Sequence, residues 1–239
     1  MLSVKAPLKT LRDMIAIPSV NPMGRGFSGE LYSEKNMADY AARRLRALDM
    51  DVVITAADPE HPCVVGRLDV GASETLLLEA HMDTVSHENM SIAPFDPEVR
   101  DGRVYGRGSC DTKASLALYI DALEILAARG IEPAFNLVVA GVSEEEFSFG
   151  GVRHLLEGYG LRADFAVVGE PTELNMLIRH KGVLRFYVRA EGKSCHSSTP
   201  ELGHNAIYAI SRAILALEQY HQELLTRPAH PLLGHASLS

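Results

Sequence analysis

Short apolar runs that lead into an acid or a histidine recur along this chain of 239 residues. Three of the runs are typical of buried parallel strands, and they span 75–80, 135–142 and 165–169. The polar residues that follow them are His81 and Asp83, then Glu144-Glu145-Glu146, and then Glu170. Ligands bind beyond the carboxyl ends of the strands in open α/β sheets, so a metal site at this edge is the leading hypothesis.

Apolar positions at helical spacing predict helices between these strands. The helical segments cover 8–17, 33–48, 115–129 and 150–157. Ser33 is the expected N-cap of the second segment, and Gly130 closes the third. The expected buried stripe of that third helix consists of Leu116, Tyr119, Ile120, Leu123 and Leu126.

Two further apolar runs, 52–55 and 63–68, predict additional strands. Turn signals predict a surface connection with a short hairpin over 86–108. Together these elements predict an α/β fold, in which helices flank a mostly parallel central sheet.

The character of the sequence changes after Glu170. Segment 183–190 carries arginines among its apolar residues, which predicts a half-solvated antiparallel strand, and a helix is expected over 205–225. One strand and one helix do not complete a layer. We therefore expect one domain over 1–179, which carries the candidate metal site, and the first half of a small α+β domain over 180–239.

Charge and composition narrow the class of protein. The chain is 46% hydrophobic with a net charge of −8, which argues against nucleic-acid or anionic-membrane partners. No apolar stretch approaches the roughly 20 residues of a membrane span, and the N-terminus lacks the apolar core of a signal peptide. Three scattered cysteines form no disulfide framework. We expect a cytoplasmic protein.

Each candidate ligand also has a structural alternative. In an extended segment Asp83 and His81 point the same way, so Asp83 can orient the imidazole for metal binding, or the pair is simply a strand end. Asp111 precedes a predicted helix, where it can be an N-cap or a carboxylate that bridges two metal ions. Glu170 can equally be a turn residue before Pro171.

The three adjacent glutamates at 144–146 are harder to explain as a solvated face, because they lie where the sheet meets its ligand crevice. Adjacent carboxylates can divide the work, one binding metal and the other accepting a proton. His196 lies in a polar loop, where a surface histidine is the default, and nothing nearby activates Cys195 as a nucleophile.

The order of the motifs resembles that of a known family. The motifs are His81-Met-Asp-Thr-Val85, Gly106-Arg-Gly-x-x-Asp111-x-Lys113, Glu144-Glu145 with Ser148-x-Gly150, Gly169-Glu-Pro-Thr172 and His196-Ser-Ser-x-Pro200-x-x-Gly203-x-Asn-Ala-Ile207, with Ile17-Pro-Ser-Val-Asn-Pro22 at the N-terminus. They are similar to those of the dinuclear zinc hydrolases that include acetylornithine deacetylase, succinyl-diaminopimelate desuccinylase, aminoacylase and carboxypeptidase G. The resemblance implies a zinc-exopeptidase-like fold with a lid and dimerisation domain.

The resemblance also implies a role for each motif residue. The implied zinc ligands are His81, Asp111, Glu145 and Glu170, with Asp111 bridging two ions. Asp83 would orient His81, and Glu144 would be the general base. Spacing back from Ser148-Phe-Gly150 favours this register, although Glu146 leaves an ambiguity of one residue. A cis peptide at Asp111-Thr112 is a further implied feature.

In the second domain, His196 would reach the partner subunit's site in a homodimer and stabilise an oxyanion, and Asn205 would bind substrate. The implied substrate is a small N-acylated amino acid or peptide. The implied cofactor is Zn²⁺, two ions per full-length subunit, with Co²⁺ or Mn²⁺ as substitutes.

Family members are longer, and the segment after their lid supplies a final histidine ligand. The chain therefore looks C-terminally truncated and one ligand short, and weak or no turnover is expected of it alone. A non-catalytic dimerisation or regulatory module and a single-metal binding protein stay open as alternatives.

Overall fold

The computed structural model describes residues 5–239. The chain divides into two compact units between Glu173 and Leu174, a few residues before the boundary at 179 expected from the sequence. The strand ends that carry the predicted metal ligands all belong to the first unit.

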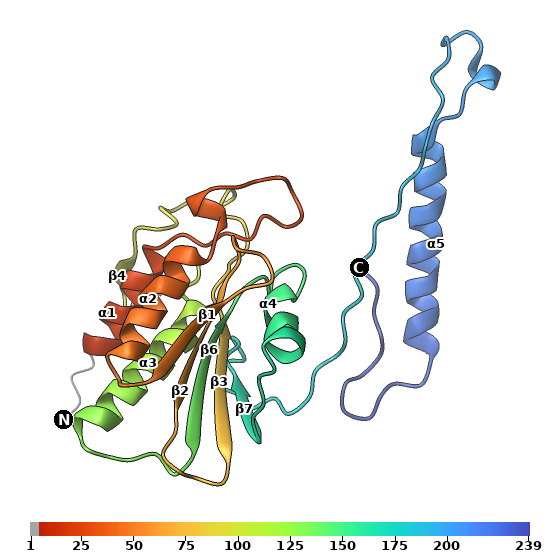
Figure 1. Ribbon diagram of the computed structural model, residues 1–239. Coiled ribbons are helices and arrows are strands. Elements are labelled where there is room, and N and C mark those ends of the chain that lie inside the picture. The colour runs from red at the N-terminus through yellow and green to blue at the C-terminus, as the bar shows by residue number, and fades with distance from the viewer. Residues whose placement is uncertain (1–4) are drawn as a thin grey trace. The chain divides into compact units, whose positions relative to one another are not determined.

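A five-stranded sheet forms the centre of the first unit (Figure 1). Its strands, in spatial order, are β1 (Asp51–Thr55), β2 (Cys63–Leu68), β6 (Asn136–Val142), β3 (Thr75–His81) and β7 (Phe165–Val168). β3 is parallel to β6 and β7, whereas the β1–β2 and β2–β6 pairs are antiparallel. The predicted α/β class is confirmed, but the sheet is mixed, not mostly parallel. The connection over 56–62 is too short for a parallel β1–β2 pair, which needs a crossover of about a dozen residues or more.

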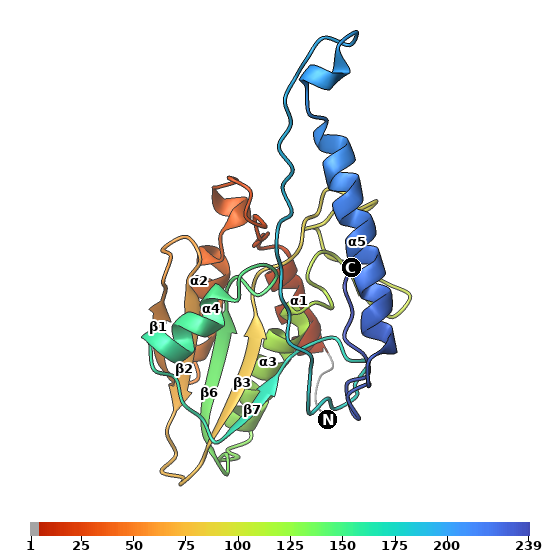
Figure 2. The same cartoon turned by 90° about the vertical axis from the view of Figure 1, so that its right-hand side faces the viewer.

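The three parallel strands bring the predicted polar residues to one edge of the sheet. His81 is in register with Val142 of β6, and Glu79 is in register with Val168 of β7. The segments that follow β3, β6 and β7 therefore leave the sheet at the same end (Figure 2). This edge is where open α/β sheets bind their ligands.

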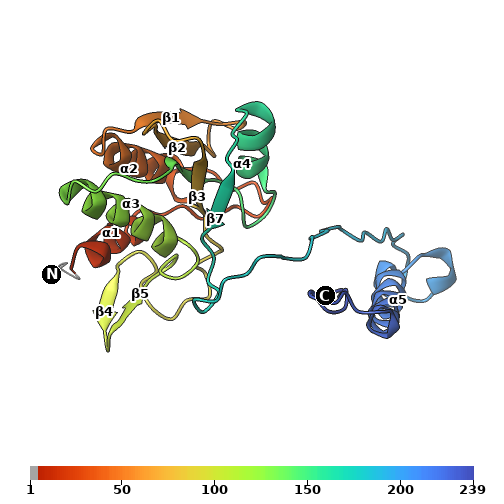
Figure 3. The same ribbon diagram turned by 90° about the horizontal axis from the view of Figure 1, so that it is seen from below.

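Helices cover both faces of the sheet (Figures 1 and 3). On one face lie α1 (Lys5–Ile15), α2 (Lys35–Arg46) and α3 (Lys113–Ala128), and on the other lies α4 (Gly150–Arg153), which continues as a π-helical turn, His154–Gly158. All four predicted helices are present, within a few residues of their expected ends. The larger core lies under the first three helices, where Met14, Met37, Leu45 and Leu116 are buried.

The predicted apolar stripe of α3 is confirmed: Leu116, Ile120 and Leu123 are buried, and Tyr119 and Leu126 pack against the same core. The stripe fixes which way α3 faces. The orientation of α3 in turn fixes where the residues just before the helix lie at the edge of the sheet.

The N-terminus of α2 differs slightly from the prediction. The N-cap position is Glu34, one residue after Ser33, although Ser33 Oγ still accepts a hydrogen bond of 3.2 Å from Lys35 N. The Glu34 side chain makes no capping bond to its own helix and is directed elsewhere.

The connection over 86–108 carries the predicted hairpin, which pairs β4 (Glu98–Arg100) with β5 (Arg103–Tyr105). Short 3₁₀ turns occur at Glu30–Tyr32 and Pro200–Leu202. None of the helices in the described part of the chain is long and apolar enough to cross a membrane.

The second unit contains α5 (Ala206–Thr226), which matches the helix predicted over 205–225. Asn205 caps it, because its Oδ1 accepts a hydrogen bond of 2.9 Å from Ile207 N. The strand predicted over 183–190 is not formed: within residues 5–239 this segment pairs with no other strand. Strand backbone needs a hydrogen-bonding neighbour, which an alternating sequence pattern does not by itself provide.

Candidate metal centre

His81, the last residue of β3, is almost completely buried, and its two ring nitrogens face different partners. Nε2 lies 3.0 Å from Asp111 Oδ1. Nδ1 lies 2.9 Å from the backbone oxygen of Asp83 and 3.5 Å from Asp83 Oδ1. The backbone carbonyl, and not the carboxylate as expected from the sequence, is thus the closer partner that orients the imidazole. A ring held through Nδ1 can present Nε2 to a metal ion.

The carboxylate of Asp83 instead organises the acidic loop, which we define as Ser143 to Glu146. Asp83 Oδ1 accepts a hydrogen bond from Glu145 N and Oδ2 accepts one from Glu146 N, each 3.1 Å long. Although burial opposes its ionisation, hydrogen bonds from His81 and the loop hold the pKa of Asp83 below its ordinary value. A fully buried anion therefore fixes the backbone of the loop that carries three glutamates.

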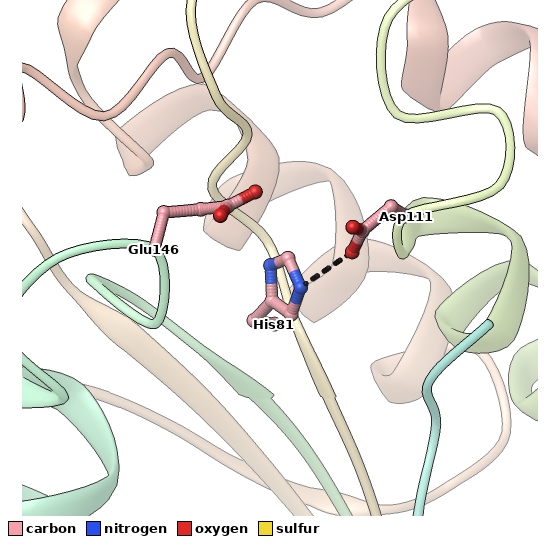
Figure 4. A group of neighbouring side chains, drawn as sticks. All are labelled: His81, Asp111 and Glu146. Atoms are coloured by element: carbon pink, nitrogen blue, oxygen red, sulfur yellow. Dashed lines mark hydrogen bonds and ion pairs between the residues drawn. The ribbon is translucent and has the colours of Figure 1, made fainter. Parts of the chain in front are cut away.

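A group of side chains that could hold a metal ion surrounds His81 (Figure 4). Ligand atoms of His81, Asp111 and Glu146 all lie within 4.8 Å of one another, with Asp111 and Glu146 directed at the imidazole from opposite sides. Glu170 Oε1 lies 3.7 Å from His81 Nε2. The structure therefore brings together one imidazole and carboxylates from three separate segments.

Asp111 is held at the start of α3 by its neighbour. The Asp111-Thr112 peptide is cis, as the resemblance implies. Thr112 Oγ1 donates a hydrogen bond of 2.7 Å to the backbone oxygen of Gly169, directly before Glu170. This bond ties the beginning of α3 to the end of β7 and thereby holds two candidate ligands beside each other.

The group attracts positive charge. Although burial disfavours the imidazolium, hydrogen bonds to Asp111 and Asp83 raise the pKa of His81 to about 11. Burial, together with the charge of Asp111, raises the pKa of Glu146 to about 7, and burial also raises the pKa of Glu170. One imidazole nitrogen and several carboxylate oxygens are a donor set suited to a divalent cation such as Zn²⁺, which binds these groups in their deprotonated form.

The acidic loop places its three glutamates differently. Glu146 has a ligand atom within 4.8 Å of those of His81 and Asp111, and the ligand role predicted for Glu145 stays a prediction. Glu144, expected to be the general base, has a left-handed backbone with φ of 58° and packs its carboxylate against Gly150. This left-handed residue comes directly before Glu145 and Glu146 in the loop.

The remaining predicted site residues, His196 and Asn205, lie in the second unit. His196 is exposed, and its Nδ1 lies 2.7 Å from Ser198 Oγ. Asn205 is the N-cap of α5. Their roles at the metal group stay predictions.

Two residues that support the site were quoted in the sequence motifs without a role. Asn21 Nδ2 donates a hydrogen bond of 2.8 Å to Asp83 Oδ2. Lys113 is fully buried, and its Nζ donates to the backbone oxygens of Met14 and Ile17 at 3.1 and 2.7 Å. The sequence signal for these two residues was their presence in the motifs. Their hydrogen-bond partners lie far away in the sequence, so the sequence did not reveal what they support.

Comparison with known proteins places the chain in a class. Residues 77–232 match the model of Peptidase family M20/M25/M40. Because the match covers more than half of the chain, the protein belongs to this family, and the resemblance drawn from the motifs is confirmed.

Two curated relatives show the same relationship. An uncharacterized metallohydrolase of Methanocaldococcus jannaschii is 32% identical over 225 residues, which cover 85% of this chain and 54% of that protein. Acetylornithine deacetylase of Proteus mirabilis is 32% identical over 237 residues, which cover 96% of this chain and 59% of that protein. The chain thus spans between a half and two thirds of the length of these relatives.

Solved structures share the fold. A tripeptidase of Staphylococcus aureus superposes with a TM-score of 0.61 at 21% identity, covering 90% of this chain and 56% of the other. Human carnosine dipeptidase 1 gives a TM-score of 0.59 at 24% identity, covering 69% and 38%. At such identities the likeness concerns the fold alone.

Proposed function

We propose that this protein is a metal-dependent hydrolase that cleaves an amide bond in an N-acyl amino acid or a small peptide. The observation that carries the proposal is the group formed by His81, Asp111 and Glu146 at the carboxyl edge of the sheet. Family membership and the similarity to acetylornithine deacetylase support the reaction and the substrate class.

The residues that would hold the metal are His81, Asp111, Glu146 and Glu170. Imidazole and carboxylate are the ligand types of catalytic zinc sites, so we propose Zn²⁺, two ions per subunit, with Co²⁺ or Mn²⁺ as substitutes. Bound zinc supplies Lewis acidity, which acidifies water and polarises a carbonyl group. Asp83 and Asn21 keep His81 and the acidic loop in place for it.

Which glutamate of the acidic loop is the general base depends on which of them is the metal ligand. The place of Glu146 beside His81 favours shifting both roles by one residue relative to the sequence prediction, so that Glu146 is a ligand and Glu145 the base. Glu145 would accept the proton of the attacking water and deliver it to the leaving amine. Glu144 would then act only through the backbone turn of the loop.

The second unit would complete the site. We propose that His196 stabilises the oxyanion in the partner subunit of a homodimer, that Asn205 binds the substrate, and that the protein is cytoplasmic. The similarity to acetylornithine deacetylase and membership of the family support a shared arrangement.

Three glutamine substitutions test the register. Zinc affinity is measured by competition with a chromophoric chelator, and hydrolysis is measured on a panel of N-acyl amino acids and dipeptides. We expect E146Q to weaken zinc binding by at least about tenfold, and E145Q to keep zinc but lose turnover. E144Q should keep both. Loss of zinc in E145Q together with loss of turnover in E144Q would restore the register read from the sequence.

Metal dependence tests the reaction itself. Hydrolysis by the wild-type protein, even if slow, should stop with a chelator and return with Zn²⁺, Co²⁺ or Mn²⁺. A protein that binds zinc tightly but hydrolyses none of these substrates would be a metal-binding or dimerisation module, and the proposed function would be wrong.

A further inference from the structure

Three consecutive backbone amides of the acidic loop are bound by buried carboxylates. Those of Glu145 and Glu146 donate to Asp83, and that of Glu144 points at Glu34 Oε1, 3.4 Å away. Glu34 lies in the segment that begins α2, far from the loop in sequence. Its carboxylate is the second anion that holds this loop, and no catalytic or metal-binding role accounts for it.

Glu34 is paired with a histidine. Glu34 Oε2 lies 2.6 Å from His61 Nδ1, and the two side chains are 1% and 12% exposed. A carboxylate buried to this extent needs a hydrogen-bonded partner, and His61 is that partner. The pair joins the start of α2 to the segment just before β2.

His61 also contacts the loop through its backbone. Its carbonyl oxygen accepts a hydrogen bond of 2.7 Å from Ser143 Oγ, and Ser143 Oγ lies 3.4 Å from Cys63 Sγ. The Glu34–His61 pair thus engages two successive loop residues, Ser143 through a carbonyl and Glu144 through a carboxylate. Contacts at two adjacent residues restrain the loop more than either would alone.

The loop conformation needs such restraint. Glu144 adopts a left-handed backbone with φ of 58°, which is unfavourable for a residue with a side chain. This turn comes immediately before Glu145 and Glu146. If it relaxed, both carboxylates would swing relative to His81, so contacts that hold the turn also set the geometry of the metal group.

We propose that Glu34 and His61 are a positioning pair, which holds the turn at Glu144 so that Glu146 faces His81 and Asp111. The inference rests on the proposed function, since it assigns the pair to the site proposed to bind zinc. Outer partners of this kind commonly change metal affinity by about 10- to 100-fold when they are replaced.

The test uses E34Q, which keeps the shape of the side chain, and the variants H61A and H61N. Zinc affinity and hydrogen exchange of the loop amides at 144–146 are measured in the intact protein. We expect E34Q and H61A to bind zinc at least about tenfold more weakly and to exchange these amides faster in the metal-free state. H61N retains a donor near the position of Nδ1, and it should recover part of the lost affinity.

Asp121 provides the matched control. It is a buried carboxylate of α3, 1% exposed, that accepts hydrogen bonds from Thr10 and Arg44. D121N should therefore lower the free energy of unfolding without changing zinc affinity or loop exchange. The inference is overturned if E34Q and H61A bind zinc as the wild type does with unchanged exchange at 144–146, or if D121N weakens zinc binding as much as they do.

Should E34Q not fold, H61A and H61N decide the question by the same two measurements. Both are made without substrate, so failure of the wild-type protein to hydrolyse amides would count against the proposed function alone.

Discussion

Lys113 Nζ lies 2.7 Å from the backbone oxygen of Ile17, in the interior of the protein. The same nitrogen also donates to the backbone oxygen of Met14, so one side chain at the start of α3 contacts both the last turn of α1 and the segment just after it. The contact holds α1 against the segment that begins with Asp111. Lys113, which belongs to one of the sequence motifs, is therefore part of the scaffold of the site.

Replacing Lys113 by methionine should destabilise the protein. K113M keeps the length of the side chain but leaves the partly buried backbone oxygen of Ile17 without its donor, which we expect to lower the free energy of unfolding by about 1–3 kcal/mol in urea. Lys9 is the control, because its side chain is 77% exposed and pairs with Asp13 at the surface. K9M should cause no measurable change. Equal stability of K113M and wild type would contradict the assigned role.

Zinc should stabilise the folded protein. A ligand that binds only the native state at 100 times its Kd adds about 2.7 kcal/mol, and here it also neutralises acids that lie close together. Urea unfolding with and without a chelator measures the difference. H81Q should lose most of the zinc-dependent gain, because the histidine lies at the centre of the group. A gain of the same size in H81Q would place the bound zinc elsewhere.

The Glu34–His61 pair should make stability depend on pH. The hydrogen bond to Glu34 raises the pKa of His61 above its ordinary value of 6.5, and burial raises the pKa of Glu34 above 4.5. The folded protein thus holds these protons more tightly than the unfolded chain does. For His61 this contribution to stability is complete below the unfolded pKa and is lost as the pH rises through the folded pKa.

The measurement is urea unfolding of wild type and H61N at several pH values. The stability advantage of wild type should be largest below pH 6.5 and should shrink as the pH rises beyond it. An advantage that stays constant across this range, or grows with pH, would show that His61 does not carry the proton assigned to it.

Gly151 should tolerate no side chain. A Cβ atom there would lie 2.3 Å from the backbone oxygen of Ser143 and 2.6 Å from its nitrogen, so α4 or the acidic loop would have to move. We expect G151A to cost about 1–3 kcal/mol of unfolding free energy and to weaken zinc binding. Gly26 has open space around it, so G26A should be nearly neutral. Wild-type behaviour of G151A would mean that the loop can shift without consequence.

The edge of the sheet could be predicted because its signals are local. Apolar runs define β3, β6 and β7, and parallel pairing brings the residues after them to one end. The places and directions of β1 and β2 in the sheet depend on the length of the connection between them and on the strands that they pair with. A single apolar run does not encode these.

The details of the site depended on non-local geometry. Glu144, Glu145 and Glu146 are chemically identical neighbours, so the sequence alone does not show that Glu146 lies within reach of His81 and Asp111. The pairing of Glu34 with His61 joins segments that have no common motif. Segment 183–190 shows the opposite case, because it has the pattern of a strand but no partner within the described chain.

The hydrogen bond from Thr112 to Gly169 joins segments that are synthesised at different times, 57 residues apart. His81 can approach Glu170 only after β7 has been added beside β3. A nascent chain therefore completes this group of side chains only once residue 170 has left the ribosome, when β1, β2, β3 and β6 are already available to pair. The candidate metal site is thus assembled late in biosynthesis, after the other strands of the sheet.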